Sequence, residues 1–302
     1  MVNPMLKHAL SRLTVGVWSA LLLFSCLPNE IEAQQNSLQT AQGLLHDDHS
    51  SVEVGSAPDK GPDAAAKDAA ENPVAAAISL PFQNNTYYGV GPYRRAENAL
   101  LIEPVVPMKL SRNWMVISRT IVPVVVIPRL SSVEEVDYGL GNIQPQLYLS
   151  PVHVGKFIWG IGPQLWLPTA TDDKLGINKW GGGPTTVGLL RTGHWLGGAL
   201  VNNEFAGLNH VHENLMTLNG FLYYNFKRGW YVLSTPIVTA DWTAERNKRW
   251  TVPVGGGAGK LFKIGSQPLN ARAEFFNDIR TTAGGPDWQM QTQLQFIFIR
   301  HK

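Results

Sequence analysis

The segment Trp288–Ile299, which reads WQMQTQLQFIFI, alternates between polar and apolar side chains. Every second residue from Gln289 to Gln295 is a glutamine, with a methionine, a threonine and a leucine between them. Successive side chains of a β-strand point to opposite faces of the sheet, so this strand has one amide face and one apolar face. Strands of outer-membrane barrels combine such alternation with aromatic residues at both membrane interfaces. A soluble sandwich strand can look similar, so the rest of the chain must distinguish the two.

Composition excludes several classes of function. Charged residues make up 16% of the 302 residues, below the roughly 25% of typical soluble domains. The net charge of +2 gives no electrostatic basis for a nucleic-acid partner. A single cysteine excludes an internal disulfide framework, and no Cys/His zinc spacing is present. The sequence therefore predicts no cofactor and no bound metal.

The N-terminal part is typical of an exported protein. Residues 1–33 combine basic Lys7 and Arg12 with an apolar run of about a dozen residues, which predicts a signal peptide. Two processing sites remain open. Cleavage after Ala33 is one, and the other is a sequence resembling a lipobox, which would leave a lipidated Cys26. Residues 34–72 are polar and Ala-rich, and we expect them to be a disordered linker.

From residue 73 onward, segments of about ten residues recur between turn signals, and no long amphipathic helical pattern appears. The segments are Ala76–Val90, Ala99–Leu110, Trp114–Ile127, Gly139–Ser150, Lys156–Leu167, Pro184–Thr192, Trp195–Phe205, Leu215–Phe226, Trp230–Trp242, Trp250–Phe262, Leu269–Arg280 and Trp288–Ile299. Short turns alternate with longer polar loops, as in bacterial membrane barrels. Residues 73–302 are therefore predicted to form an all-β, antiparallel, up-and-down transmembrane β-barrel of about 12 strands.

Tryptophans mark the ends of these segments. Trp114, Trp195, Trp230, Trp250 and Trp288 each open one, and indole prefers the membrane–water interface. Only helices and closed barrels can span hydrocarbon, and the mature region has no apolar run long enough for a spanning helix. We expect the cell outer membrane of a Gram-negative bacterium as the location, with its lipid and the barrel-assembly machinery as partners.

The polar strand faces are predicted to line the lumen. Two functions remain open: a porin-like barrel or transporter for small solutes, including hydrophobic or aromatic ones, and a structural or ligand-binding barrel with a filled lumen, tethered through Cys26. The candidate lumen residues carry amides and both charge signs. They are Glu103, Lys109, Arg119, Gln144, Gln146, Gln164, Glu204, Asn219, Asn225, Arg272, Glu274, Gln289, Gln291, Gln293 and Gln295.

An enzymatic barrel is disfavoured. Outer-membrane phospholipases use a Ser–His pair two residues apart, but His210 and His212 have no serine at that spacing. The chain also has no GxSxG motif. The glycine runs 181–183 and 255–257 lack the context of a phosphate loop and are predicted to allow turns, close packing or bends in the barrel wall.

Linked motifs resemble a family of Gram-negative envelope proteins. The motifs are PFQNNT (Pro81–Thr86), VGPY (Val90–Tyr93), RTIVPV (Arg119–Val124), IWGIGPQLWLPTATDD (Ile158–Asp173), GALVNNEF (Gly198–Phe205) and WTVPVGGGAGKLFKIGSQPLNA (Trp250–Ala271). Members are labelled uncharacterised transporters, or misleadingly neuromedin U, and are related to outer-membrane proteins of aromatic (phenol meta-pathway) degradation. The resemblance implies an outer-membrane β-barrel and no catalytic set. This chain departs from the usual barrel ending, because four residues follow Phe298.

Overall fold

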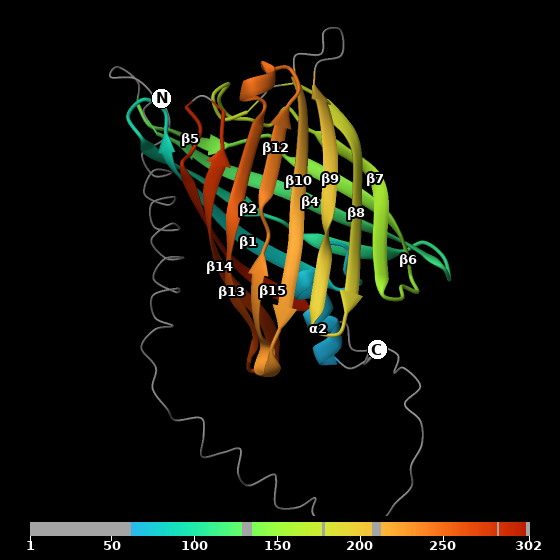
Figure 1. Ribbon diagram of the computed structural model, residues 1–302. Coiled ribbons are helices and arrows are strands. Elements are labelled where there is room, and N and C mark those ends of the chain that lie inside the picture. The colour runs from blue at the N-terminus through green and yellow to red at the C-terminus, as the bar shows by residue number, and fades with distance from the viewer. Residues whose placement is uncertain (1–61, 129–134, 177–178, 207–212, 283, 300–302) are drawn as a thin grey trace, which may run out of the picture. The chain divides into compact units, whose positions relative to one another are not determined.

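The computed structural model describes residues 62–128, 135–176, 179–206, 213–282 and 284–299. The predicted signal peptide and Cys26 lie outside these residues. The described chain begins with one α-helix and continues as a single antiparallel sheet (Figure 1). No helix within these residues is long and apolar enough to cross a membrane.

Strand segments follow one another around the sheet. Their bounds are β1 Ile78–Val90, β2 Arg95–Ile102, β3 Val105–Lys109, β4 Trp114–Ile127, β5 Asp137–Leu140, β6 Gln144–Pro151, β7 Phe157–Trp166, β8 Gly181–Thr192, β9 Trp195–Ala206, β10 Glu213–Asn225, β11 Trp230–Ser234, β12 Ile237–Asp241, β13 Trp250–Ile264, β14 Gln267–Arg280 and β15 Trp288–Phe298. Two short 3₁₀ turns, Lys227–Gly229 and Arg246–Lys248, lie in connections.

Three pairs of segments are halves of one strand. Segments β2 and β3 both pair with β1 and β4, β5 and β6 both pair with β4, and β11 and β12 both pair with β10 and β13. Pro104 and Pro236 lie in two of the interruptions, where a missing N–H cannot continue the ladder. The described segments therefore amount to 12 strands, which confirms the predicted number.

The sheet closes on itself. The first strand pairs with the last in continuous antiparallel register, from Ile78 opposite Phe298 to Tyr88 opposite Trp288. Closure removes the unpaired edge that an open sheet would expose. The predicted all-β, antiparallel 12-stranded barrel is confirmed, and Trp288–Ile299 contains the closing strand.

The faces of the strands are inverted relative to a soluble barrel. On β7, Phe157, Ile161 and Leu165 are 57%, 53% and 47% exposed, whereas Gln164 on the opposite face is 0% exposed. The glutamine face of β15 is likewise buried, whereas Phe298 on the opposite face is exposed. A soluble barrel places its apolar face inward. This barrel therefore has an apolar outer surface and a largely polar interior.

Aromatic side chains collect at both ends of the barrel. Because the strands alternate in direction, Trp114, Trp195 and Trp230 begin strands at one end, whereas Trp250 and Trp288 begin strands at the other. Ring contacts reinforce both groups: Trp114 with Trp159, Trp195 with Tyr224, Trp242 with Trp250, and Tyr88 stacked on Trp288 at 3.8 Å. The outer wall thus carries an aromatic group at each rim of its apolar band.

Residues 62–71 differ from the prediction. They lie in the segment expected to be a disordered linker, but they form helix α2, Pro62–Glu71. Alanine has the highest helix propensity, and proline is favoured in the first turn, where its missing N–H costs nothing. Ala66, Ala69 and Ala70 pack against Ala75 and Ile297. The barrel interior supplies the apolar surface that this short helix lacks by itself.

The glycine runs serve close packing of strands. A Cβ at Gly183 would overlap the carbonyl oxygen of Asn203, and a Cβ at Gly257 would overlap that of Ala273. Both positions therefore need a residue without a side chain, as the packing prediction proposed.

Candidate functional site

The predicted lumen residues lie in different parts of the barrel. Most are buried on the inner wall: Glu103, Gln146, Gln164, Glu204, Asn225, Glu274, Gln289, Gln291, Gln293 and Gln295. Arg119, Gln144, Asn219 and Arg272 are partly buried. Lys109 differs, because it is the last residue of β3 and it is exposed. Its register partner, Met115, is buried and points inward. Lys109 belongs to the rim of the barrel and not to the inner wall.

One hydrogen-bonded network follows the inner wall from β3 to β9. Arg119 forms a 2.8 Å ion pair with Glu103 and donates to Gln146 Oε1 at 3.0 Å. Gln146 donates to Gln164 Oε1 at 2.6 Å, and Gln164 donates onward to Glu204. Glu103 sits at the interruption between β2 and β3, so the broken strand places a carboxylate opposite Arg119. We call these five residues the first network.

A second network covers the opposite wall. The guanidinium of Arg272 donates to Gln83 and Gln293 at 2.9 Å each and to the hydroxyl of Tyr223 at 3.1 Å. It also lies 3.4 Å from the carboxylate of Glu274. That carboxylate accepts two bonds from Thr235, which occupies the interruption between β11 and β12. We call this group, centred on Arg272, the second network.

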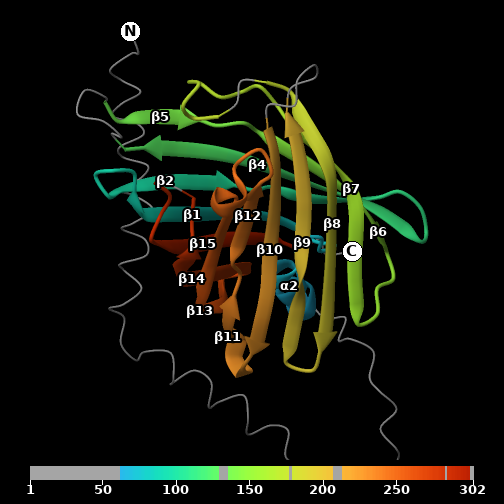
Figure 2. The same ribbon diagram turned by 45° about the horizontal axis from the view of Figure 1, so that its top comes forward.

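Helix α2 crosses the lumen between distant strands. Asp68 forms a 2.7 Å ion pair with Arg191 of β8, and the carbonyl of Ala69 accepts a 2.7 Å bond from Gln295 of β15. The strands β8 and β15 are sixth and twelfth in the ring of 12, so they face each other across the barrel. Figures 1 and 2 show α2 within the ring of strands, near the end at which β8 and β9 are joined. The helix therefore obstructs the lumen.

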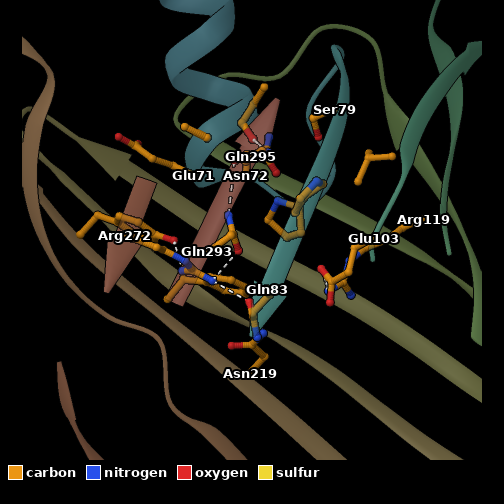
Figure 3. A pocket seen from close by; sticks show the side chains of 17 residues that line it. Glu71, Asn72, Ser79, Gln83, Glu103, Arg119, Asn219, Arg272, Gln293 and Gln295 are labelled. Atoms are coloured by element: carbon orange, nitrogen blue, oxygen red, sulfur yellow. Dashed lines mark hydrogen bonds and ion pairs between the residues drawn. The ribbon is translucent and has the colours of Figure 1, made fainter. Parts of the chain in front are cut away.

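A small cavity separates the end of α2 from the two networks (Figure 3). Its volume is about 60 Å³, enough for a few water molecules. Glu103 and Arg119 line one side, and Arg272 and Gln293 line another. The cavity is thus a polar chamber between the helix and the two networks.

The inner wall is apolar toward the end of the barrel at which β8 and β9 are joined. Met115, Ile117, Leu189, Leu196 and Leu233 form one buried cluster with other inward-facing side chains and with Val74, which follows α2. This cluster explains why Trp114–Ile127 and Trp230–Trp242 are apolar on both faces over part of their length. The interior therefore changes along its axis from hydrogen-bonding groups to hydrocarbon.

Several residues of the interior were not among the candidates. Gln83, Tyr148, Tyr223, Thr235 and Asn270 take part in the buried hydrogen bonds. Tyr148, Tyr223 and Asn270 each share a strand face with candidate residues, so alternation along those strands could have identified them, whereas Gln83 lies on β1, which contributed no candidate. Thr235 lies at an interruption, where alternation gives no guide. The described residues include no group of three or more His, Cys, Asp or Glu side chains arranged to hold a metal ion.

No family model and no curated protein sequence matches this chain. Among solved structures, the COG4313 outer membrane channel from Pseudomonas putida F1 aligns with a TM-score of 0.55 at 12% identity, covering 76% of this chain and 98% of that one. The KdgM porin in complex with disordered oligogalacturonate aligns with a TM-score of only 0.40 at 12% identity, over 74% of this chain and 100% of that one. The first similarity supports the barrel fold, and the second is too low to support an inference.

Proposed function

We propose that this protein is an outer-membrane channel for small solutes, with α2 as an internal plug. The observation that carries the proposal is the combination of an apolar outer wall, a hydrogen-bonding inner wall and a helix lying across the lumen. An apolar band between two aromatic rims is the surface that a bilayer solvates well. The fold shared with an outer membrane channel agrees with this proposal.

The lining favours neutral solutes with both polar and apolar parts. Within the two networks, each arginine is paired with a carboxylate and the remaining carboxyl group, Glu204, accepts a hydrogen bond from Gln164, so the arginines offer little field to an anion. Amides and tyrosine hydroxyls can bind polar groups, and the buried apolar cluster lies next to them. An aromatic solute with one or two polar groups matches this sequence of surfaces. The motif resemblance to envelope proteins of aromatic degradation favours the same class.

A filled barrel without transport is the second candidate, because α2 and the apolar cluster occupy one part of the lumen. Liposome swelling distinguishes the two functions. Vesicles containing the purified chain should swell in small neutral aromatic solutes faster than in ions of equal size. Vesicles that take up no solute faster than protein-free vesicles would favour the filled barrel.

A further inference from the structure

A second cavity lies on another side of α2, beside the β10–β11 turn. Its volume is about 200 Å³, and it is formed jointly by the helix and the barrel wall. Lys67 and Glu71 come from α2, whereas Asn225, Phe226, Tyr231 and Leu261 come from the wall. Neither network contributes a residue to the lining of this cavity, and the proposed channel function assigns it no role.

Glu71 gives this cavity a free hydrogen-bond acceptor. Its side chain is only 3% exposed, and its buried Oε2 has no hydrogen-bond partner. A buried polar atom without a partner is costly, so the site gains from a donor that reaches it. Burial raises the pKa of Glu71, and Lys67, Arg191 and a side-chain hydrogen bond with Asn225 oppose this rise. In Figure 3 the Glu71 side chain extends away from Glu103 and Arg119, which lie across the first cavity.

The polar groups of the wall are already engaged. The Tyr231 hydroxyl donates to Asn270 at 2.6 Å, and Asn225 Nδ2 donates to the carbonyl of His194 at 3.2 Å. An occupant therefore meets aromatic and aliphatic surface on the wall and the two charged groups on the helix. The ammonium of Lys67 disfavours a cationic occupant, and the carboxyl of Glu71 disfavours an anionic one.

We propose that this cavity binds a small neutral alcohol. A hydroxyl can donate to Glu71 Oε2 and accept from Lys67, which no ammonium or carboxylate does without repulsion. An apolar cavity of about 150 Å³ holds one benzene ring, so the volume here suits a ring of about six carbons with its hydroxyl. The ring packs against Tyr231 and Leu261.

An occupant of this site bridges the helix and the wall. Because a ligand stabilises the state that it binds, an alcohol in the cavity holds α2 in the lumen. This consequence rests on the proposed channel function, whereas the binding itself does not.

Calorimetric titration of the purified full chain in detergent tests the binding, with heats from protein-free micelles subtracted. Cyclohexanol is the probe, and cyclohexylamine, cyclohexanecarboxylate and methylcyclohexane are its matched comparators. Cyclohexanol should bind one molecule per chain, about tenfold or more tightly than any comparator. Equal or tighter binding of a comparator, or no saturable heat with cyclohexanol, overturns the proposal. This probe series needs no variant.

Variants locate the site. Glu71→Leu removes the acceptor and should weaken cyclohexanol binding about tenfold or more, and Leu261→Trp should abolish it by filling the cavity. Leu165→Trp, on the exposed outer face of β7, is the control and should bind normally. Undiminished binding by folded Glu71→Leu and Leu261→Trp rejects the site. In planar bilayers cyclohexanol should lower the conductance of the full chain. A chain that binds cyclohexanol and conducts nothing refutes the channel and leaves the site standing.

Discussion

At the level of single residues, the interior depends on pairing buried charge. Arg272 contacts Glu274, Gln83, Gln293 and Tyr223, so its guanidinium is almost fully engaged. Glu274 is 0% exposed and has one cationic partner among the described residues. Removing one member of a buried ion pair leaves the other uncompensated. Arg272 is thus a residue on which the stability of the barrel depends.

Arg272→Leu should lower the free energy of unfolding by about 3–5 kcal/mol, because it strands the Glu274 carboxylate. Denaturant titration of the protein in lipid vesicles, followed by tryptophan fluorescence, measures this. Lys109→Leu is the control, since Lys109 is exposed at the end of β3, and it should change stability by less than about 0.5 kcal/mol. If Arg272→Leu lowered the free energy of unfolding by no more than the control does, the Arg272–Glu274 pair would not be needed for stability.

At the level of secondary structure, α2 is held by few polar contacts. Among the described residues, its polar links to the strands are the Asp68–Arg191 ion pair, the bonds from Gln295 and Asn270 to helix carbonyls, and a side-chain hydrogen bond between Glu71 and Asn225. Buried alanines supply the rest. An element with small side chains and few polar links has a low free energy of local release. We therefore expect α2 to leave its place more readily than any strand.

Charge reversal tests the Asp68–Arg191 link. Asp68→Arg and Arg191→Asp each place like charges together, and each should raise conductance in planar bilayers roughly two- to fivefold. The combined variant restores opposite charges and should conduct like the parent. Equal conductance of all four proteins would remove the ion pair from any role in holding the helix.

The strands were far easier to predict than the helix. Each of the 12 predicted segments overlaps a strand of the barrel, because alternation and the tryptophans at Trp114, Trp195, Trp230, Trp250 and Trp288 are local signals. Helix α2 has an Ala-rich sequence with Pro62 at its start, and this local pattern favours a helix. Its burial, however, depends on strands far away in the chain. Gln295 could be placed on a polar face, but nothing local shows that it binds Ala69.

For the whole molecule, the outer surface determines the environment. Ile161 is 53% exposed in the middle of β7, between the two aromatic rims. In water an exposed apolar surface of this kind promotes aggregation, whereas in lipid the same side chain is well solvated. The inversion of faces is therefore the strongest argument for a bilayer around the barrel.

Ile161→Arg should destabilise the barrel in vesicles by about 2–4 kcal/mol, because a charge near the bilayer midplane is poorly solvated. Gly155→Arg provides the matched control, because Gly155 lies in a turn with open space around it, and it should cost about 0–1 kcal/mol. Denaturant titration in vesicles compares the two. Equal effects would indicate that water, and not lipid, surrounds Ile161.

The plugged channel itself is tested most directly by planar-bilayer recordings of the full chain beside a variant that lacks residues 62–72. Deletion removes α2 from between β8 and β15 while leaving every strand intact. The full chain should show small or infrequent conductance steps, and the deletion variant should show larger and more persistent ones. Both proteins should retain heat-modifiable gel mobility. Folded proteins with identical conductance, or with none, would refute a channel closed by α2.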